Sequence, residues 1–291
     1  MNKIKYFVSS FFKSFDEKKC PYCQSNNVIQ IDQKFIFTKL LKCKKCNFQF
    51  RFPLDSYDES IKFYQDDYEQ EGLTTDLPTD DELSYLIKSD FKNGAKDFSS
   101  HINLINRLDI HSERLRILDY GANWGYTSWQ FIKAGFDVSS FEISKPRAKY
   151  GKEKLGIDIK TDISEIKGKF DVLFSSHVIE HLPNINDFID VSKKLLKDNG
   201  VFIAYCPNGS DELKKTNPKG FHGFWGQVHP NYLSKDFYKF IFKKNPYLIT
   251  STPLDNDLLD KWNNNQIIGT LSNNELLIIT KINKEISSEN Y

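Results

Sequence analysis

Short apolar runs separated by longer polar stretches characterise the chain from about residue 80 onward. The runs "RILDY", "DVSSFE", "IDIK", "FDVLFSS" and "VFIAY" are rich in β-branched and aromatic residues, which favour strands. The stretches between them are long enough for helices, and "ELLIITKI" predicts one more strand near the C-terminus. This alternation predicts an α/β fold: a mostly parallel sheet with helices on both faces and a last strand that we expect to be antiparallel.

Polar residues directly follow the predicted strands. They are Asp119, Glu142, Asp162 and residues 175–177, which read "SSH". Ligands of open parallel sheets bind beyond the carboxyl ends of the strands. We therefore expect these side chains to line one crevice.

The first fifteen residues, "MNKIKYFVSSFFKSF", place apolar side chains at helical spacing. Such a helix packs on the body of the protein or on a second subunit, or it lies on a membrane surface with its lysines facing lipid head groups. The segment lacks the small-residue cleavage site of a signal peptide, and no apolar run approaches the roughly 18 residues of a membrane span. We expect a cytoplasmic protein.

Two cysteine pairs, Cys20/Cys23 in "CPYC" and Cys43/Cys46 in "CKKC", have the spacing of a zinc site. The segment between them alternates like a β-hairpin, which predicts a zinc ribbon. Four thiolates leave no open position on the metal, so the expected role of Zn²⁺ is structural. Two disulfides are the alternative, and they require an oxidising compartment to which nothing directs the chain.

The charges are balanced, with 40 Lys+Arg against 39 Asp+Glu and a net charge of +1. No overall field therefore attracts nucleic acid. The lysines near the cysteines are expected to offset the negative charge of the thiolates. They are Lys18, Lys19, Lys42, Lys44 and Lys45. The fifth cysteine, Cys206, follows a predicted strand and is expected to be a core thiol.

Residues 117–128, "ILDYGANWGYTS", have the outline of a nucleotide-binding glycine loop. Counting from Gly121, the second glycine position of G-x-G-x-x-G holds Asn123 and the third holds Tyr126, which argues against a bound pyrophosphate and against NAD. Asn tolerates a positive φ, so the tight turn itself survives. A turn without a phosphate suits a nucleoside joined to a small zwitterion, such as S-adenosylmethionine. Glu142, at the end of the next strand, is placed to accept hydrogen bonds from ribose hydroxyls.

With "FEIS", "FDVLFSSHVIEHLPN" and "VFIAYCPN", this loop resembles the motifs of class I S-adenosylmethionine-dependent methyltransferases, whose domain is Rossmann-like. The cysteines and the "FRFPLDSYDESIKFYQDDY" stretch resemble more narrowly bacterial methyltransferases with an N-terminal zinc-binding module. Those enzymes act on nucleotide sugars, surface glycans or natural products. The resemblance covers about residues 18–282.

The resemblance implies a role for each matching residue. Around the cofactor, Asp119, Gly121, Asn123 and Gly125 shape the pocket for the methionine end, Glu142 binds ribose, Asp162 lies near the adenine amino group, and Ser176 and His177 flank the sulfonium. The catalytic candidates are His177 and His181 in "HVIEHLP" and His229 in "FWGQVHPNYLS". His229 matches the position of the proposed catalytic histidine in related enzymes. An imidazole with an unperturbed pKa of about 6.5 is suited to accept a hydroxyl proton.

Two departures favour O-methylation over C-methylation. Related sugar C-methyltransferases carry a further C-terminal domain, which we do not expect here, and a Tyr where this chain has Gly226. The expected reaction is therefore SN2 methyl transfer to a hydroxyl of a sugar, nucleotide sugar, polysaccharide precursor or other small molecule, with a histidine base. An RNA methyltransferase and a non-catalytic scaffold protein are the alternatives. Nearby aromatics either stack on substrate or pack: Tyr57, Phe63, Tyr64, Tyr68, Phe221, Phe224, Trp225 and Tyr232.

The expected organisation follows the order of these motifs along the chain. It comprises an amphipathic segment (1–17), a zinc ribbon (18–52), a linker or lid (53–79), the methyltransferase domain (80–285) and a tail (286–291). The expected partner is a small-molecule or glycan substrate and not nucleic acid, and the sequence does not determine the oligomeric state.

Overall fold

The computed structural model describes residues 10–62, 76–262 and 265–282. The chain forms two compact units. The first unit comprises Met1–Phe63, Ser175–Lys194 and Asp198–Tyr291, and the second comprises Tyr64–Phe174 and Leu195–Lys197. The units therefore interleave along the chain, whereas the predicted domains follow one another. The predicted boundaries at residues 52 and 80 stay predictions.

Parallel strands form the centre of the second unit. In the order β7-β4-β5-β6, the pairs β4–β5, β4–β7 and β5–β6 are all parallel. The side chains of β4 and β7 are almost all buried, which explains why the runs "RILDY" and "FDVLFSS" are mostly apolar. The bounds are Arg116–Tyr120 (β4), Asp137–Phe141 (β5), Ile159–Lys160 (β6) and Phe170–Ser176 (β7).

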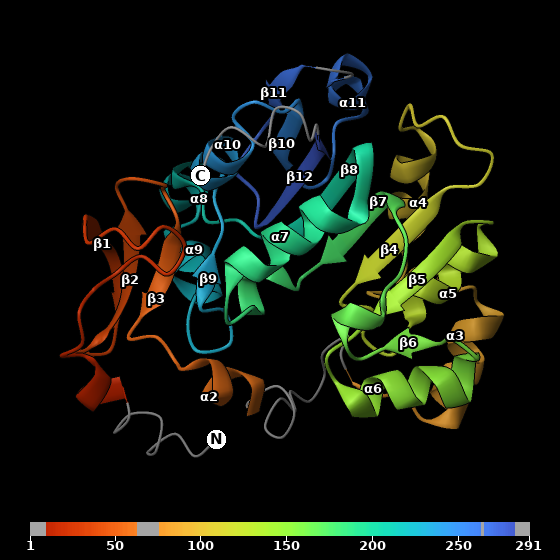
Figure 1. The fold of residues 1–291 in the computed structure, drawn as a ribbon, viewed down its shortest axis with the longest axis horizontal. Helices are drawn as coiled ribbons and strands as arrows, with labels where there is room; N and C mark the ends of the chain where they lie inside the picture. The colour runs from red at the N-terminus through yellow and green to blue at the C-terminus, as the bar shows by residue number, and fades with distance from the viewer. Residues whose placement is uncertain (1–9, 63–75, 263–264, 283–291) are drawn as a thin grey trace. The chain divides into compact units, whose positions relative to one another are not determined.

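Helices connect the strands of the second unit, and α6 runs next to β6 (Figure 1). The first helix, α3, begins with a capping box in which Thr79 and Glu82 satisfy each other's backbone N–H groups. The bounds are Asp80–Lys88 (α3), Ser99–Asn106 (α4), Tyr126–Lys133 (α5), Lys145–Tyr150 (α6), Gly151–Leu155 (η2) and Ile163–Glu165 (η3). The predicted α/β fold with a mostly parallel sheet is confirmed.

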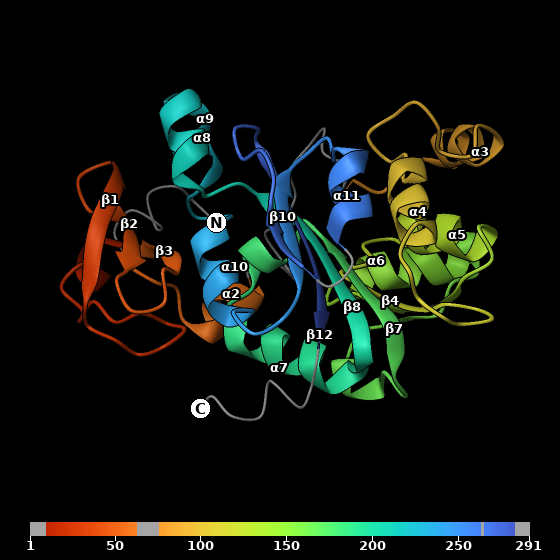
Figure 2. The ribbon, with the colours of Figure 1, turned by 90° about the horizontal axis from the view of Figure 1, so that it is seen from above.

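Four strands in the order β11-β10-β12-β8 form one sheet region of the first unit. The last strand, β12, runs antiparallel to both β8 and β10, as the sequence predicted. Helix α11 contacts β10 and β11, and Figure 2 shows it beside β10. The bounds are Leu196–Pro207 (β8), Tyr247–Ser251 (β10), Gln266–Ile268 (β11), Glu275–Ile282 (β12), Ile179–His181 (η4), Ile185–Leu195 (α7) and Asn256–Trp262 (α11).

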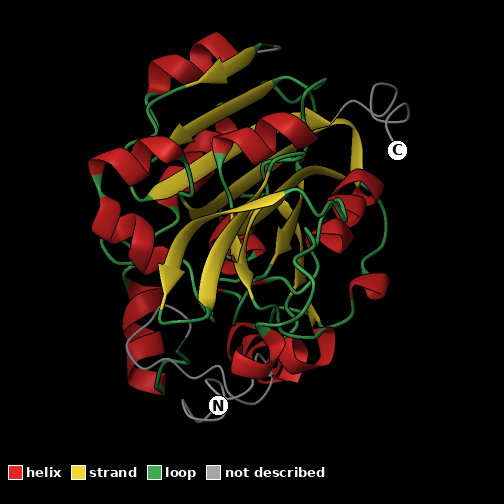
Figure 3. Cartoon of the chain, turned by 90° about the vertical axis from the view of Figure 1, so that its left-hand side faces the viewer, coloured by secondary structure: helices red, strands yellow, loops and turns green. Residues whose placement is uncertain are grey.

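A four-stranded sheet in the order β1-β2-β3-β9 also belongs to the first unit. Figure 3, in which all strands are yellow, views the chain from the side on which Figure 1 labels β1, β2 and β3. Strands β1 (Val28–Lys34) and β2 (Thr38–Cys43) form the predicted antiparallel hairpin. β3 (Gln49–Phe52) continues the sheet and pairs with β9 (Asn231–Tyr232), a segment from the C-terminal half of the chain. The ribbon is thus completed by a strand from the C-terminal half, and helix α2 (Tyr57–Lys62) follows it.

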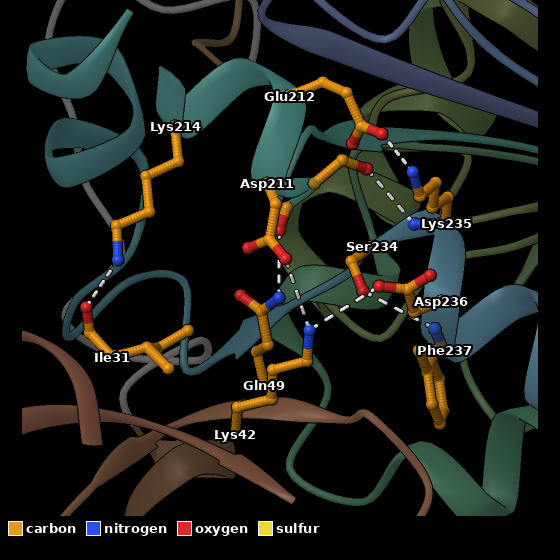
Figure 4. A network of polar contacts seen from close by, with 12 residues as sticks. Ile31, Lys42, Gln49, Asp211, Glu212, Lys214, Ser234, Lys235, Asp236 and Phe237 are labelled. Carbon is orange, nitrogen blue, oxygen red and sulfur yellow. Dashed lines mark hydrogen bonds and ion pairs between the residues drawn. The ribbon is translucent and has the colours of Figure 1, made fainter. Parts of the chain in front are cut away.

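Polar contacts anchor this ribbon to helices α8 (Asp211–Thr216) and α10 (Lys235–Ile241) (Figure 4). A further contact joins it to α9 (Pro218–Phe224), where Nδ1 of His222 lies 2.9 Å from the carboxylate of Asp32. The Gln49 amide donates to the carbonyl of Gly209 at 2.9 Å. The ammonium of Lys42 lies 3.6 Å from the carboxylate of Asp211 and 3.5 Å from that of Asp236. Lys42 therefore pairs with these carboxylates, and the expectation that the lysines offset the cysteine thiolates stays a prediction.

The predicted N-terminal helix lies mostly outside the described residues, which begin at Ser10. Within the described part, Phe12 and Phe15 are 68% and 77% exposed. Phe11 packs edge-on against Phe37, with ring centroids 5.6 Å apart. Within residues 10–62, 76–262 and 265–282, no helix has the length and apolarity that crossing a membrane requires. The proposed packing and membrane-surface roles and the expected location stay predictions.

Candidate functional site

Every second residue of the glycine loop after β4, from Gly121 to Gly125, has a positive φ, in the left-handed region of the Ramachandran plot. φ is +90° at Gly121, +53° at Asn123 and +90° at Gly125. Asn123 thus occupies the strained position that the sequence assigned to it. A Cβ on Gly125 would lie 3.1 Å from the Ile159 side chain, so this position favours glycine on both conformational and steric grounds.

The carboxylate of Glu142 lies directly beneath this loop. One oxygen accepts the backbone N–H of Asn123 at 2.9 Å, and the other accepts that of Ser144 at 2.8 Å. Burial raises the pKa of Glu142, and the hydrogen bonds from the backbone oppose that shift. A carboxylate offers about four acceptor positions. With the backbone N–H of Ile143, which also hydrogen-bonds this carboxylate, the backbone fills most of these positions. Acceptor capacity remains for a ribose hydroxyl, so the carboxylate fits a nucleoside.

Asp119 is tied to the elements that flank the loop, and its predicted place in the cofactor pocket stays a prediction. It is 2% exposed and accepts the hydroxyl of Ser128, on α5, at 2.6 Å. The same hydroxyl lies 2.7 Å from that of Ser140 on β5. Burial raises the pKa of Asp119 to about 7, with a further contribution from the negative charge of Glu142. Asp119 therefore joins strand β4 to α5 and β5 just below the turn.

The raised pKa predicts that Asp119 destabilises the folded state as pH rises. The pKa of Asp119 is about 7 in the folded chain and about 3.8 in the unfolded chain. Between these values the unfolded chain ionises Asp119 and the folded chain does not, so rising pH favours the unfolded state. Relative to Asp119→Asn, wild type should lose up to about 4 kcal/mol of unfolding free energy between about pH 4 and pH 9. Urea unfolding across that range measures the difference. Asp109→Asn, at an exposed position, is the control, and an equal pH slope in wild type and Asp119→Asn would contradict the prediction.

Asp162 has a clear local role. Its carboxylate accepts the backbone N–H of Ser164 at 2.8 Å and caps the short helix η3. The cap lowers the pKa of Asp162, which is exposed. Ser176 and His177 belong to the first unit, whereas Asp119, Glu142 and Asp162 belong to the second. The expectation that all of them line one crevice stays a prediction.

The four predicted zinc ligands cluster in the first unit. Their sulfur atoms all lie within 4.8 Å of one another, with Cys20 and Cys46 3.6 Å apart and Cys23 and Cys43 3.5 Å apart. Sulfur ligands of a tetrahedral zinc ion lie about 3.8 Å apart, so the donor set and spacing fit Zn²⁺. The cysteines are free thiols, and no disulfide joins them. Three of the four are fully buried, which suits a closed structural site.

His177 is held between two carboxylates of the first unit. Nδ1 lies 3.1 Å from Glu180 and Nε2 lies 2.7 Å from Glu275. Burial lowers the pKa of His177, but the two carboxylates outweigh burial and raise it to about 10. The imidazole is therefore protonated at neutral pH and is poorly suited to accept a proton there.

His181 and His229 form an edge-to-face pair, with ring centroids 4.7 Å apart. Their Nδ1 atoms lie 2.8 Å from the carbonyl of Val228 and 2.7 Å from that of Phe224, respectively. Because a carbonyl only accepts, each Nδ1 carries the proton and each Nε2 is the basic nitrogen. Burial lowers the pKa of His181 to about 4, against the opposing charge of Glu180.

Glu180 completes this group and was not among the predicted site residues. It is 1% exposed and lies between the two histidines of "HVIEHLP". The sequence offered a signal, because a carboxylate beside two histidines in one short motif is a common ligand or proton-relay pattern. We call Glu180, His181 and His229 the histidine–glutamate cluster.

Three of the aromatic candidates for substrate stacking belong to the core. Phe221, Trp225 and Tyr232 are at most 1% exposed and pack with Leu40 of the ribbon. Tyr57 is 58% exposed. Phe63, Tyr64 and Tyr68 lie outside the described residues, so their role stays a prediction.

Comparison with known proteins identifies one family for most of this chain. The family described as "Methyltransferase domain" matches residues 93–262, which is more than half of the chain. The match begins before α4 and ends with α11, so it includes the glycine loop, Glu142 and the histidine–glutamate cluster.

Two curated relatives are ubiquinone biosynthesis O-methyltransferases. The protein of Pelagibacter ubique is 31% identical over 161 residues, covering 49% of this chain and 65% of the relative. The protein of Bartonella quintana is 29% identical over 175 residues, covering 52% and 68%. This chain thus spans about two thirds of the length of these relatives. Among solved structures, a plantazolicin methyltransferase in complex with a triazolic desmethylPZN analog and SAH aligns with a TM-score of 0.49, 13% identity and coverage of 70% of this chain and 91% of that chain.

Proposed function

This chain belongs to the methyltransferase domain family, and we propose that it transfers a methyl group from S-adenosylmethionine to a hydroxyl of a small-molecule or glycan acceptor. The observation that carries the proposal is the pairing of the glycine loop with Glu142. The loop presents a tight turn at Asn123, where a pyrophosphate loop requires glycine. The buried carboxylate beneath it keeps acceptor capacity for a ribose.

Bound S-adenosylmethionine supplies an electrophilic methyl group on its sulfonium sulfur. In the proposed reaction the acceptor oxygen attacks this carbon, the C–O bond forms as the C–S bond breaks, and the hydroxyl proton leaves to a base. Such a transfer asks the protein mainly to position the two partners and to remove one proton.

His229 is the base that the local geometry favours. Its Nδ1 proton is held by the carbonyl of Phe224, so Nε2 presents a lone pair. His177 is disfavoured because Glu180 and Glu275 keep it protonated. The low pKa of His181 makes it a weak proton acceptor.

An oxygen acceptor is also in keeping with the relatives, which are named O-methyltransferases. Their names refer to ubiquinone biosynthesis and not to glycans, so the glycan expectation gains no support from them. We retain the hydroxyl as the proposed acceptor group, with its carrier to be found by experiment. The RNA alternative predicts strongly salt-dependent RNA binding, and the scaffold alternative predicts cofactor binding without turnover.

Replacing Glu142 with alanine tests the cofactor site. The loss of two charge-assisted hydrogen bonds, at about 1.5–3 kcal/mol each, should weaken S-adenosylmethionine binding by about 10²- to 10⁴-fold. Isothermal titration calorimetry measures the dissociation constant. Because Glu142 also accepts two backbone N–H groups, the substitution should lower the free energy of unfolding as well.

Two further variants separate binding from stability. Glu142→Gln keeps one carbonyl oxygen and should fall between wild type and alanine in affinity. Glu165→Ala removes an exposed carboxylate of the same unit and should bind as wild type does. An unchanged dissociation constant in a folded Glu142→Ala protein would remove Glu142 from the site and with it the main support for the proposed function.

A further inference from the structure

The histidine–glutamate cluster contains a buried polar atom that the protein does not satisfy. Glu180 is 1% exposed, and its Oε2 has no hydrogen-bond partner among the described residues. Its other oxygen, Oε1, lies 3.1 Å from Nδ1 of His177. A buried carboxylate oxygen without a partner is costly, so its position calls for a ligand.

Both neighbouring imidazoles are oriented as metal ligands. The carbonyls of Val228 and Phe224 hold the Nδ1 protons of His181 and His229, which leaves Nε2 as the coordinating nitrogen of each ring. Such outer hydrogen bonds set the tautomer and the ring orientation of metal-bound histidines. His177 acts on Glu180 in the same way, because it fixes one carboxylate oxygen and is itself held by Glu275.

The three potential ligand atoms converge. One carboxylate oxygen of Glu180 and one ring nitrogen each of His181 and His229 lie within 4.8 Å of one another. Atoms bound about 2.1 Å from a common ion lie at most about 4.2 Å apart, so small side-chain rotations suffice to close the site. The backbone that carries them is fixed, since the Asn231 amide donates to the carbonyls of Ile179 and Leu182 on either side of the Glu180–His181 turn.

We propose that Glu180, His181 and His229 bind a divalent transition-metal ion, distinct from the zinc of the four-cysteine cluster. Two imidazoles and one carboxylate form a set that suits Zn²⁺, Fe²⁺, Co²⁺ or Mn²⁺, and three protein ligands leave at least one position open. Oε1 of Glu180 lies 4.0 Å from Nε2 of His181. An ion bound by both carboxylate oxygens would therefore also satisfy the orphaned Oε2. The open position accepts an oxygen ligand, such as water.

If the chain methylates a hydroxyl, as proposed above, the oxygen ligand at the open position is the hydroxyl of the acceptor. This part of the inference rests on the proposed function. Metal coordination lowers the pKa of a bound hydroxyl or water and so eases loss of its proton. Because Nε2 of His229 cannot bind a metal ion and accept a proton at once, metal dependence of the reaction distinguishes the ligand role from the base role.

Cobalt binding to the full-length, zinc-loaded protein tests the site. After equilibrium dialysis against Co²⁺, elemental analysis should find one cobalt per chain beside one retained zinc, and the visible spectrum should lack the intense bands of cobalt–thiolate bonds. Glu180→Gln and His229→Ala should each weaken cobalt binding at least about tenfold. His111→Ala, which removes an exposed imidazole of the second unit, should bind cobalt as wild type does.

The outcomes separate this inference from the proposed function. Wild type that binds no cobalt beyond the four-cysteine cluster, or folded Glu180→Gln and His229→Ala proteins that bind it as tightly as wild type, would overturn the metal site. Circular dichroism and the melting temperature confirm that each variant is folded, and His181→Ala is the substitute if one is not. Calorimetry with S-adenosylmethionine on the same samples tests the proposed function independently, because cobalt binding does not require the cofactor.

Discussion

Replacing Cys43 with serine is expected to release zinc and to unfold the ribbon formed by β1, β2 and β3. Structural zinc binding contributes folding free energy directly, so the first unit should lose on the order of 3 kcal/mol or more. Because β3 pairs with β9, and Phe48 packs on Phe237 with ring centroids 4.8 Å apart, loosening should extend to residues 231–237. Zinc content and amide hydrogen exchange measure both effects.

The second unit should be spared. It contains the glycine loop, Glu142 and none of the cysteines, so cofactor binding by Cys43→Ser should stay near wild type. Cys206→Ser is the matched control, since this buried thiol lies outside the cluster, 3.6 Å from the Tyr238 hydroxyl, and should leave zinc bound. Full zinc occupancy in Cys43→Ser would contradict the assigned ligand set. Loss of cofactor binding would show that the two units depend on each other.

Replacing His229 with alanine is expected to lower kcat by about 10²–10⁴ and to leave the affinity for S-adenosylmethionine near wild type. The reason is loss of the group that removes the acceptor proton, whether by its own Nε2 or through a metal ion that it binds. The purified protein is incubated with the cofactor and an extract of a strain lacking the gene, and mass spectrometry follows the mass increment of one methylene group.

His222→Ala is the control for this experiment. Its imidazole is similarly placed in the first unit but pairs with Asp32, 2.9 Å away, outside the histidine–glutamate cluster. It should retain turnover. Full turnover by His229→Ala would exclude His229 as base and as essential ligand. If His229 acts as a metal ligand, a chelator that spares the cysteine zinc should lower wild-type kcat as the substitution does, and insensitivity to the chelator would favour the base role.

The sequence determined the elements with strong local signals. The runs "RILDY", "FDVLFSS" and "ELLIITKI" coincide with β4, β7 and β12, because buried strands require continuous β-forming apolar residues. The four cysteines converge as their spacing predicted. The positive φ of Asn123 follows from the limited set of residues that adopt such a turn.

Only the tertiary structure decided how distant segments combine. The pairing of β3 with β9 depends on burial and on backbone hydrogen bonds between segments that lie far apart along the chain. A strand of two residues carries no local sequence pattern that would predict this pairing. The same holds for Lys42, whose carboxylate partners come from α8 and α10.

The roles of the histidines show the physical reason most clearly. The sequence identified His177, His181 and His229 as candidates from one motif and one loop, with the same ordinary imidazole chemistry for each. Their surroundings separate them: two carboxylates keep His177 protonated, and burial keeps His181 neutral. Burial and charge at a side chain depend on every segment packed around it. The sequence therefore predicted His177, His181 and His229 as equivalent candidates, and only the folded chain distinguished their surroundings.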